Sequence, residues 1–199
     1  MRRVFLLTLL ALALPMAAFA NSSVDFTNSG GTLVGTSGGM TLTNSTLIAV
    51  NGLGGGGLIT GSNLGTVDFT TGALTSGSLQ MGGTFAAGGT FTITGNGTNG
   101  VPNGVIFTGT FSGPVTWTLV TLANGTHNYT LTGALSGSMG GGSGVTVQLT
   151  VNTGKGFFNG STTISSGDTN IVVPEPGTLG LLGTGLVGIA GLIRRKFIG

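Results

Sequence analysis

Apolar and polar residues alternate with a period of two in several segments between residues 21 and 164, as they do in β-strands. The alternation is regular over residues 145–151 and covers a shorter span at residues 90–94. Thr and Val, which favour strands, are frequent, and no ten residues show a helical period without a glycine. We expect these two strands and six others, at residues 41–50, 66–70, 105–111, 115–122, 127–132 and 161–164.

Turn residues separate the predicted strands. The pair Asn-Gly, which favours two-residue type I′ hairpins because both positions need positive φ, begins at residues 51, 96, 99, 103, 124 and 159. In the clearest hairpin, a turn at Asn124-Gly125 would pair Val120 with Tyr129. In this register Trp117 and Tyr129 lie on opposite faces, so they would not share one sugar-stacking platform, and core packing is the better interpretation.

Strands and turns at intervals of about 8–12 residues predict an all-β domain, an antiparallel β-sandwich or open barrel with turns rich in Gly and Asn. A β-solenoid is the alternative, because residues 72–78 resemble residues 133–138, although no repeat of 20–50 residues connects them. We expect the β-rich domain at residues 21–164, with little order in residues 21–39, and a tether at residues 165–173. The large residues of the expected core are Phe26, Phe69, Phe85, Phe91, Phe107, Phe111, Trp117, Tyr129, Phe157 and Phe158.

The first twenty residues have the three parts of a secretory signal peptide. An arginine pair forms the charged start, residues 4–14 form the apolar run, and Ala18 and Ala20 supply the small residues that a signal peptidase needs. The apolar run is shorter than the ~20 residues that span a bilayer. We therefore predict a signal helix within residues 1–20 and cleavage between Ala20 and Asn21.

The other end of the chain has the composition of a short transmembrane helix. Residues 179–193 carry no charge, and Arg194, Arg195 and Lys196 follow directly. These fifteen residues would extend about 22 Å as a helix, short of a hydrocarbon core of about 30 Å, and snorkelling basic side chains reduce the difference. Because a basic cluster beside an apolar segment marks the cytoplasmic side, the β-rich domain should lie outside the cytoplasm.

This end resembles the PEP-CTERM sorting signal, in which a Val-Pro-Glu-Pro-Gly-Thr-Leu motif, a glycine-rich apolar helix and an arginine cluster follow one another. The motif would occupy residues 173–179, and the signal residues 174–199. The resemblance implies an exosortase as partner, an integral-membrane, cysteine-dependent transpeptidase or protease of Gram-negative bacteria that removes the tail. It also implies a set of substrate-recognition residues: Val173, Pro174, Glu175, Pro176 and Gly177. Passenger domains vary widely in this family, so the tail predicts handling and not activity.

Composition leaves few groups for catalysis. The chain has 42 glycines, and 5% of its residues are charged. It has no cysteine, which excludes disulfides, thiolate metal sites and cysteine nucleophiles. His127 is the single histidine, and no Gly-x-Ser-x-Gly elbow in a strand–turn–helix context accompanies it. The aspartates of the β-rich domain are scattered, unlike the paired carboxylates of glycosidases. We predict no catalytic residue, no metal site and no cofactor.

Charge placement argues against nucleic acid as a partner. Between residues 21 and 173, Lys155 is the single basic residue, and Asp25, Asp68 and Asp168 give a net charge of −2. Binding to nucleic acid requires clustered Lys and Arg to neutralise phosphates.

Three functions remain open. The first is an exported, exosortase-sorted protein of the cell surface or extracellular matrix, with no catalytic site of its own. The second is a carbohydrate-binding or adhesive module whose partner is extracellular polysaccharide, and the third, least favoured, is a secreted hydrolase. Before processing, we expect the C-terminal helix to contact membrane lipid and to anchor the protein in the cytoplasmic membrane, facing the periplasm.

Overall fold

A computed structural model of the chain describes residues 22–139 and 145–173. These residues form thirteen β-strands and one short 3-10 helix, η1 (Leu53–Gly55). The strands are β1 (Ser22–Ser29), β2 (Thr32–Thr36), β3 (Gly39–Asn51), β4 (Ile59–Thr70), β5 (Leu74–Ser78), β6 (Gly82–Phe85), β7 (Gly88–Asn96), β8 (Asn103–Phe111), β9 (Val115–Thr121), β10 (His127–Ser138), β11 (Val145–Asn152), β12 (Ser161–Thr163) and β13 (Ser166–Val173).

The helices expected near the two ends, within residues 1–20 and over residues 179–193, lie outside the described residues. In the part of the chain that the structure describes, no helix has the length and apolar character needed to cross a bilayer.

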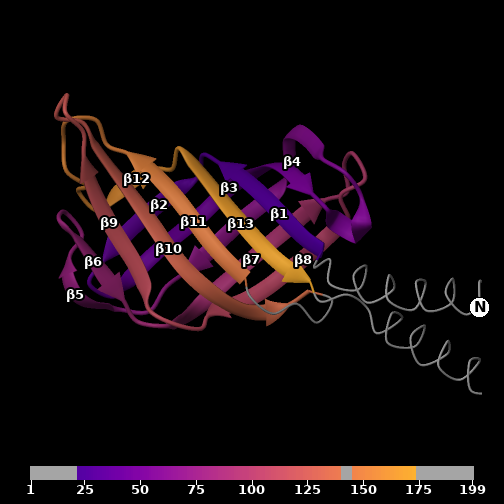
Figure 1. Cartoon of the computed structure of the whole chain (residues 1–199), viewed down its shortest axis with the longest axis horizontal. Coiled ribbons are helices and arrows are strands. Elements are labelled where there is room, and N and C mark those ends of the chain that lie inside the picture. The colour runs from indigo at the N-terminus through magenta and orange to yellow at the C-terminus, as the bar shows by residue number, and fades with distance from the viewer. Residues whose placement is uncertain (1–21, 140–144, 174–199) are drawn as a thin grey trace, which may run out of the picture. The chain divides into compact units, whose positions relative to one another are not determined.

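Eight strands pair in a closed ring (Figure 1). Hydrogen-bonded neighbours lead from β11 through β13, β1, β3, β4, β7 and β8 to β10, and β10 pairs with β11 again. Adjacent strands in the ring pair in antiparallel orientation. The prediction of an antiparallel all-β fold is therefore confirmed, but the prediction of a β-sandwich or open barrel is wrong, because one continuous sheet closes on itself. The solenoid alternative is wrong, because the strands alternate in direction around one continuous sheet.

Two short branches extend the ring where a long strand exchanges one neighbour for another. β10 pairs with β9 over its first half and with β8 over its last four residues. From β9 the sheet continues to β6 and β5. In the same way, the first residues of β3 pair with β2 and its last residues pair with β1, and β12 pairs with β2.

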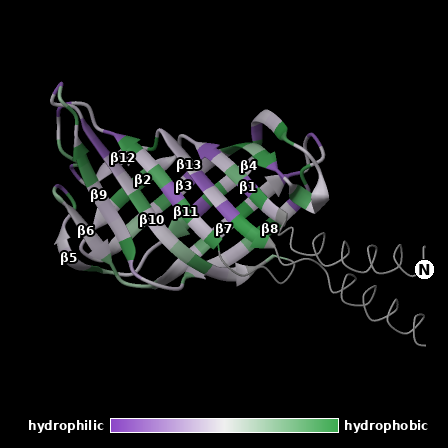
Figure 2. Cartoon of the chain, in the orientation of Figure 1, coloured by the Kyte–Doolittle hydropathy of each residue, from purple (hydrophilic) through white to green (hydrophobic). Residues whose placement is uncertain are grey.

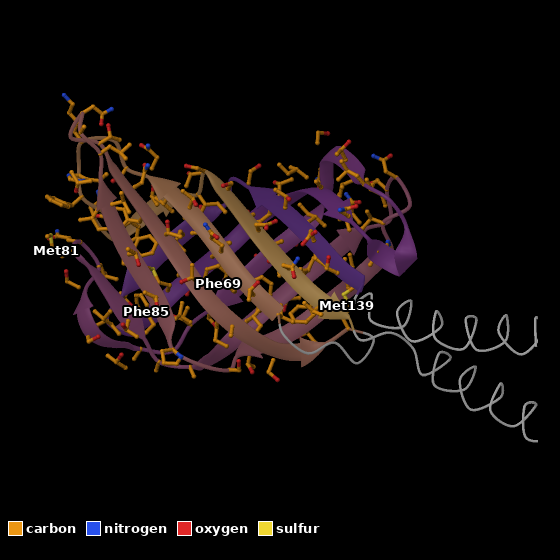
Figure 3. All side chains as sticks on the ribbon, in the orientation of Figure 1. Phe69, Met81, Phe85 and Met139 are labelled. Atoms are coloured by element: carbon orange, nitrogen blue, oxygen red, sulfur yellow. The ribbon has the colours of Figure 1, made fainter. Side chains whose placement is uncertain are left out.

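The core lies inside the ring, because alternate residues of each strand point inward. Figure 2 shows the resulting alternation of hydrophobic and hydrophilic residues along the strands. Nine of the ten expected aromatic core residues are at most 3% exposed, and Figure 3 shows two of them, Phe69 and Phe85, within the domain. Phe157 is the exception, since its side chain is 47% exposed while its neighbour Phe158 is buried. The prediction that Phe157 is a core residue is therefore wrong.

The β9–β10 hairpin has a register one residue away from the predicted one. The Leu122 N–H donates to the Thr126 carbonyl and the Gly125 N–H donates to the Leu122 carbonyl, so the loop has three residues, 123–125. Gly125 has φ 79°, as expected for a type I turn followed by a left-handed residue. Tyr129 consequently pairs with Leu119 and not with Val120. Since a one-residue shift exchanges the faces of a strand, Trp117 and Tyr129 lie on the same inner face.

Two segments that we expected to lack structure close the ring. Residues 22–29 form β1 and residues 166–173 form β13, and these strands are hydrogen-bonded neighbours. The predictions of low order at residues 21–39 and of a tether at residues 165–173 are therefore wrong for the described residues. Both segments are polar, but the inward positions of their strands hold buried Val24, Phe26 and Ile171.

Candidate functional site

The motif expected at residues 173–179 starts at the end of a ring strand. β13 pairs with β11 from Thr150↔Ser166 to Val145↔Ile171, and the Ile171 side chain is fully buried. Val173 is the last residue of β13. The chain therefore passes from the folded domain into the motif with no linker between them.

Side chains from β1 fix β13 on its other side. Asn170 Nδ2 donates to Asp25 Oδ1, and Thr27 Oγ1 donates to Asp168 Oδ1 at 3.4 Å. Burial raises the pKa of Asp168, the nearby Asp25 carboxylate raises it further, and the hydrogen bond from Thr27 opposes both effects. Sequence reasoning missed this pair of carboxylates, because Asp25 and Asp168 lie at opposite ends of the domain and only ring closure brings them together.

The side chain and the main chain of His127 both make contacts that hold neighbouring segments of the fold together. The residue is 8% exposed, and its ring stacks on Phe157, with 4.2 Å between the ring centroids and 18° between the planes. Its Nδ1 lies 3.0 Å from Thr121 Oγ1, so the hydrogen-bond partner of the ring is a hydroxyl and not a carboxylate. The main chain of His127 bonds to the loop after β11, through the Gly154 carbonyl and the Thr153 N–H. This arrangement anchors a loop against the hairpin and lacks the acid that orients a catalytic histidine.

Trp117 and Tyr129 stack inside the ring, with 4.8 Å between their centroids and 13° between their planes. The Trp117 indole N–H donates to the Leu79 carbonyl at 2.8 Å, and the Tyr129 hydroxyl donates to the Gln80 carbonyl at 2.7 Å. Both rings are at most 1% exposed, so neither offers a surface to a sugar. The core-packing prediction is confirmed, although the predicted register behind it is wrong.

Neither a three-residue metal cluster nor a nucleophile elbow occurs among the described residues. Within residues 22–139 and 145–173, no three His, Asp or Glu side chains come together as a metal site requires. The spacing Gly-x-Ser-x-Gly does occur at residues 35–39, but Ser37 lies between β2 and β3. A strand–turn–strand context does not form the nucleophile elbow of a hydrolase, which needs a helix after the turn.

The remaining predicted site residues lie outside the described residues. These are the signal-peptide cleavage residues Ala18, Ala20 and Asn21, the motif residues Pro174, Glu175, Pro176 and Gly177, and the basic residues Arg194, Arg195 and Lys196.

Comparison with known protein families gives a match that covers residues 172–196 and is described as the PEP-CTERM protein-sorting motif. The match begins inside β13 and ends at Lys196, so it includes the proline-rich segment, the apolar segment and the basic cluster. No curated protein and no solved structure matches this chain. The motif implies export and sorting to the cell surface. The chain therefore carries the PEP-CTERM protein-sorting motif at its C-terminal end.

Proposed function

We propose that this chain is an exported protein which an exosortase processes, and that its β domain is displayed at the cell surface or in the extracellular matrix without a catalytic role. The observation behind the proposal is the sorting motif at residues 172–196, which directly continues the last strand of the folded domain. The signal-peptide pattern of residues 1–20 supports it, because a C-terminal sorting motif serves only a chain that has been exported.

The order of charges and prolines fixes how the tail would be presented to the enzyme. The basic residues 194–196 stay on the cytoplasmic side, so the apolar residues 179–193 enter the bilayer with the β domain on the outer side. Pro174 and Pro176 prevent the helix from continuing toward the domain, and they leave Glu175 just outside the membrane. The proline-flanked carboxylate of Glu175 is then the feature that we propose the enzyme recognises.

The proposal places the processing cut after Val173. Thr169 and Ile171 of β13 are at most 1% exposed, and β13 contributes main-chain pairs to the ring. A cut within β13 would remove these groups and would leave β1 and β11 with unpaired edges, which promote aggregation. A cut after Val173 releases the tail and leaves the ring closed.

The test compares wild type with a variant in which Pro174, Glu175 and Pro176 are all alanine. After cell fractionation and protease treatment of intact cells, wild type is expected at the surface without its tail. The variant is expected in the cytoplasmic membrane with its tail intact. Pro102→Ala is the matched control, because it changes an exposed proline outside the motif and should be sorted like wild type. Full-length wild type in the cytosol, or surface delivery of the triple variant, would contradict the proposal.

Carbohydrate binding is the second candidate function, and a depression on the outer face of β9, β10, β11 and β13, whose lining includes Thr132, Gln148 and Asp168, favours it. A secreted hydrolase is supported only by His127, whose ring is covered by Phe157 and bonded to Thr121. If a hydrolytic activity were found and His127→Ala abolished it without unfolding the protein, this third function would replace the first.

A further inference from the structure

A polar depression of about 440 Å³ lies on the outer face of β9, β10, β11 and β13, which Figure 1 shows side by side. Four of its side chains form one row across the strands: Thr116 pairs with Thr132, Thr132 with Gln148, and Gln148 with Asp168. Because neighbouring strands lie about 4.7–4.9 Å apart, the row presents one polar group at each strand spacing. The parallel row beside it contains Ala134, Thr146 and Asn170, also register partners.

The surface is hollowed here because β10 has a glycine on its inner side. A β-carbon at Gly133 would come within 2.7 Å of two carbon atoms of the Phe111 ring, which lies directly beneath it. The strand therefore lies closer to the core than any residue with a side chain would allow. On the outer face, Ala134 adds only a methyl group at the adjacent position, so the floor of the depression stays open.

The acidic end of the depression is held in place by β1. Thr27 donates to Asp168, and Asn170 donates to Asp25, so the two polar groups contributed by β13 are held by hydrogen bonds to the neighbouring strand β1. Because Asn170 Nδ2 is occupied by Asp25, its Oδ1 is the atom that can accept a bond from a ligand. Preorganised groups lose less conformational entropy when a ligand binds.

The chemistry of the lining selects a class of ligand. Beside the apolar residues Pro114, Ala134 and Val147, it contains hydroxyl groups, amides and one carboxylate, and it contains no basic residue. Such groups donate to and accept from sugar hydroxyls, and the carboxylate can accept two of them. Anionic polymers would be repelled by Asp168 and Asp25. We propose that this depression binds a neutral polysaccharide chain laid across the four strands.

This inference rests on the second candidate function, carbohydrate binding, and deepens it by naming the site and the class of ligand; it depends on the folded domain and not on the tail. No described aromatic residue lines it, so binding rests on hydrogen bonds, and we expect a Kd on the order of 1 mM per site. Many copies displayed on one surface would convert such weak sites into strong attachment to a polymer.

The carboxylate gives the site a pH dependence. Asp25, on β1, is the titratable group that faces Asp168, and the groups facing it from β11 and β10 are Gln148 and Thr132. Since burial and Asp25 both raise the pKa of Asp168, its proton returns at a higher pH than for an ordinary aspartate. Binding should therefore weaken as the pH falls, and it should begin to do so at a higher pH than it would for an aspartate with the ordinary pKa of 3.8.

The test is an NMR titration of the purified exported protein with cellohexaose, maltohexaose and the hexamer of N-acetylglucosamine. Hexagalacturonate is the anionic comparison. We expect saturable shifts at Thr116, Thr132 and Gln148 with at least one neutral hexamer. Asp168→Asn should weaken its binding about tenfold, because a charge-assisted hydrogen bond is lost, and Thr132→Val about threefold.

The matched control is Thr108→Val, which removes an exposed outward hydroxyl on β8, in a row with Asp68 and Thr92 away from the depression. It should bind like wild type. If no neutral hexamer binds, if binding survives both Asp168→Asn and Thr132→Val, or if only hexagalacturonate binds, the proposal is wrong. Each of these results would leave sorting by the tail unaffected, so failure of this site is distinguishable from failure of the proposed function.

Discussion

Replacing Tyr129 with phenylalanine tests the packing of the core and the register of the β9–β10 hairpin together. The hydroxyl of this fully buried side chain donates to the Gln80 carbonyl at 2.7 Å and accepts from the Phe158 N–H at 3.0 Å. Tyr129→Phe removes one oxygen atom and both hydrogen bonds, but it keeps the ring stacked on Trp117. In the register that the sequence suggested, only one of these two rings could face the core.

The expected cost follows from what the lost hydroxyl leaves behind. The Phe158 N–H stays buried without its partner, which costs about 1–3 kcal/mol, whereas water can replace the bond to the partly exposed Gln80 carbonyl at a cost of about 0.5–1 kcal/mol. The free energy of unfolding should therefore fall by about 2–3 kcal/mol, and Tm by roughly 5–10 °C for a domain of this size.

Urea unfolding provides the assay, because Trp117 is the single tryptophan of the chain and its fluorescence reports on this cluster. The matched control is Thr118→Val, an exposed outward residue on β9 beside Trp117, which should change stability by less than about 0.5 kcal/mol. A change as small as the control's in Tyr129→Phe would refute the bridging role of the hydroxyl and the register derived from it.

Three further predictions concern the backbone, the carboxylates and β13. Gly65→Ala should lower the free energy of unfolding by at least about 2 kcal/mol, because φ is +150° and a β-carbon would overlap the Thr94 carbonyl. Gly88→Ala, where a β-carbon would meet open space, should lower it by about 1 kcal/mol. The urea midpoints of the two variants measure the difference. Since the pKa of Asp168 is raised, the folded protein binds the proton of this carboxyl more tightly than the unfolded protein does. Wild type should therefore gain stability relative to Asp168→Asn as the pH falls from neutral toward 3.8. Urea midpoints of the two proteins that shift in parallel with pH would contradict this. Thr146 and Asn170 are register partners on β11 and β13, and the chain has no cysteine, so the double variant Thr146→Cys, Asn170→Cys can form one disulfide between these strands. Tail removal should be as complete in this variant as in Thr146→Cys alone. If immunoblots show that the double variant keeps its tail, β13 must separate from β11 before the tail can be cut.

The strands with clear alternation could be predicted from the sequence, because each buries one face whatever its neighbours are. Residues 90–94 lie within β7 and residues 145–151 within β11, and their alternate apolar residues are buried. Local pattern is sufficient in these strands, since the period of two directly reports a half-buried strand.

The register of the β9–β10 hairpin could not be predicted, because Asn-Gly fits two loops that differ by one residue. In a two-residue loop both residues take positive φ, whereas in a three-residue loop only the final glycine does so. Among Asn124 and Gly125, only Gly125 has positive φ in the structure. The stacking and hydrogen bonding of Trp117 and Tyr129 stabilise the second arrangement, and those contacts involve Leu79 and Gln80, which are distant in sequence.

Ring closure and the polar depression were also beyond sequence reasoning. β1 and β13 have few apolar residues, and they become strands because each completes the main-chain hydrogen bonds of a neighbour: β3 for β1 and β11 for β13. The row from Thr116 to Asp168 depends on the registers of four strands, and the predicted β9–β10 register, one residue away from the observed one, does not pair Thr116 with Thr132. The sorting motif, in contrast, could be identified from the sequence alone, because its three parts follow one another directly along the chain and their order does not depend on the fold.

The most direct test of sorted display is the C-terminal peptide of protein recovered from the cell surface, identified by peptide mapping and intact mass. The account predicts a terminal peptide that includes Val173 and lacks Arg194, Arg195 and Lys196. Surface protein that still ends at Gly199, or that ends before Val173, would contradict it.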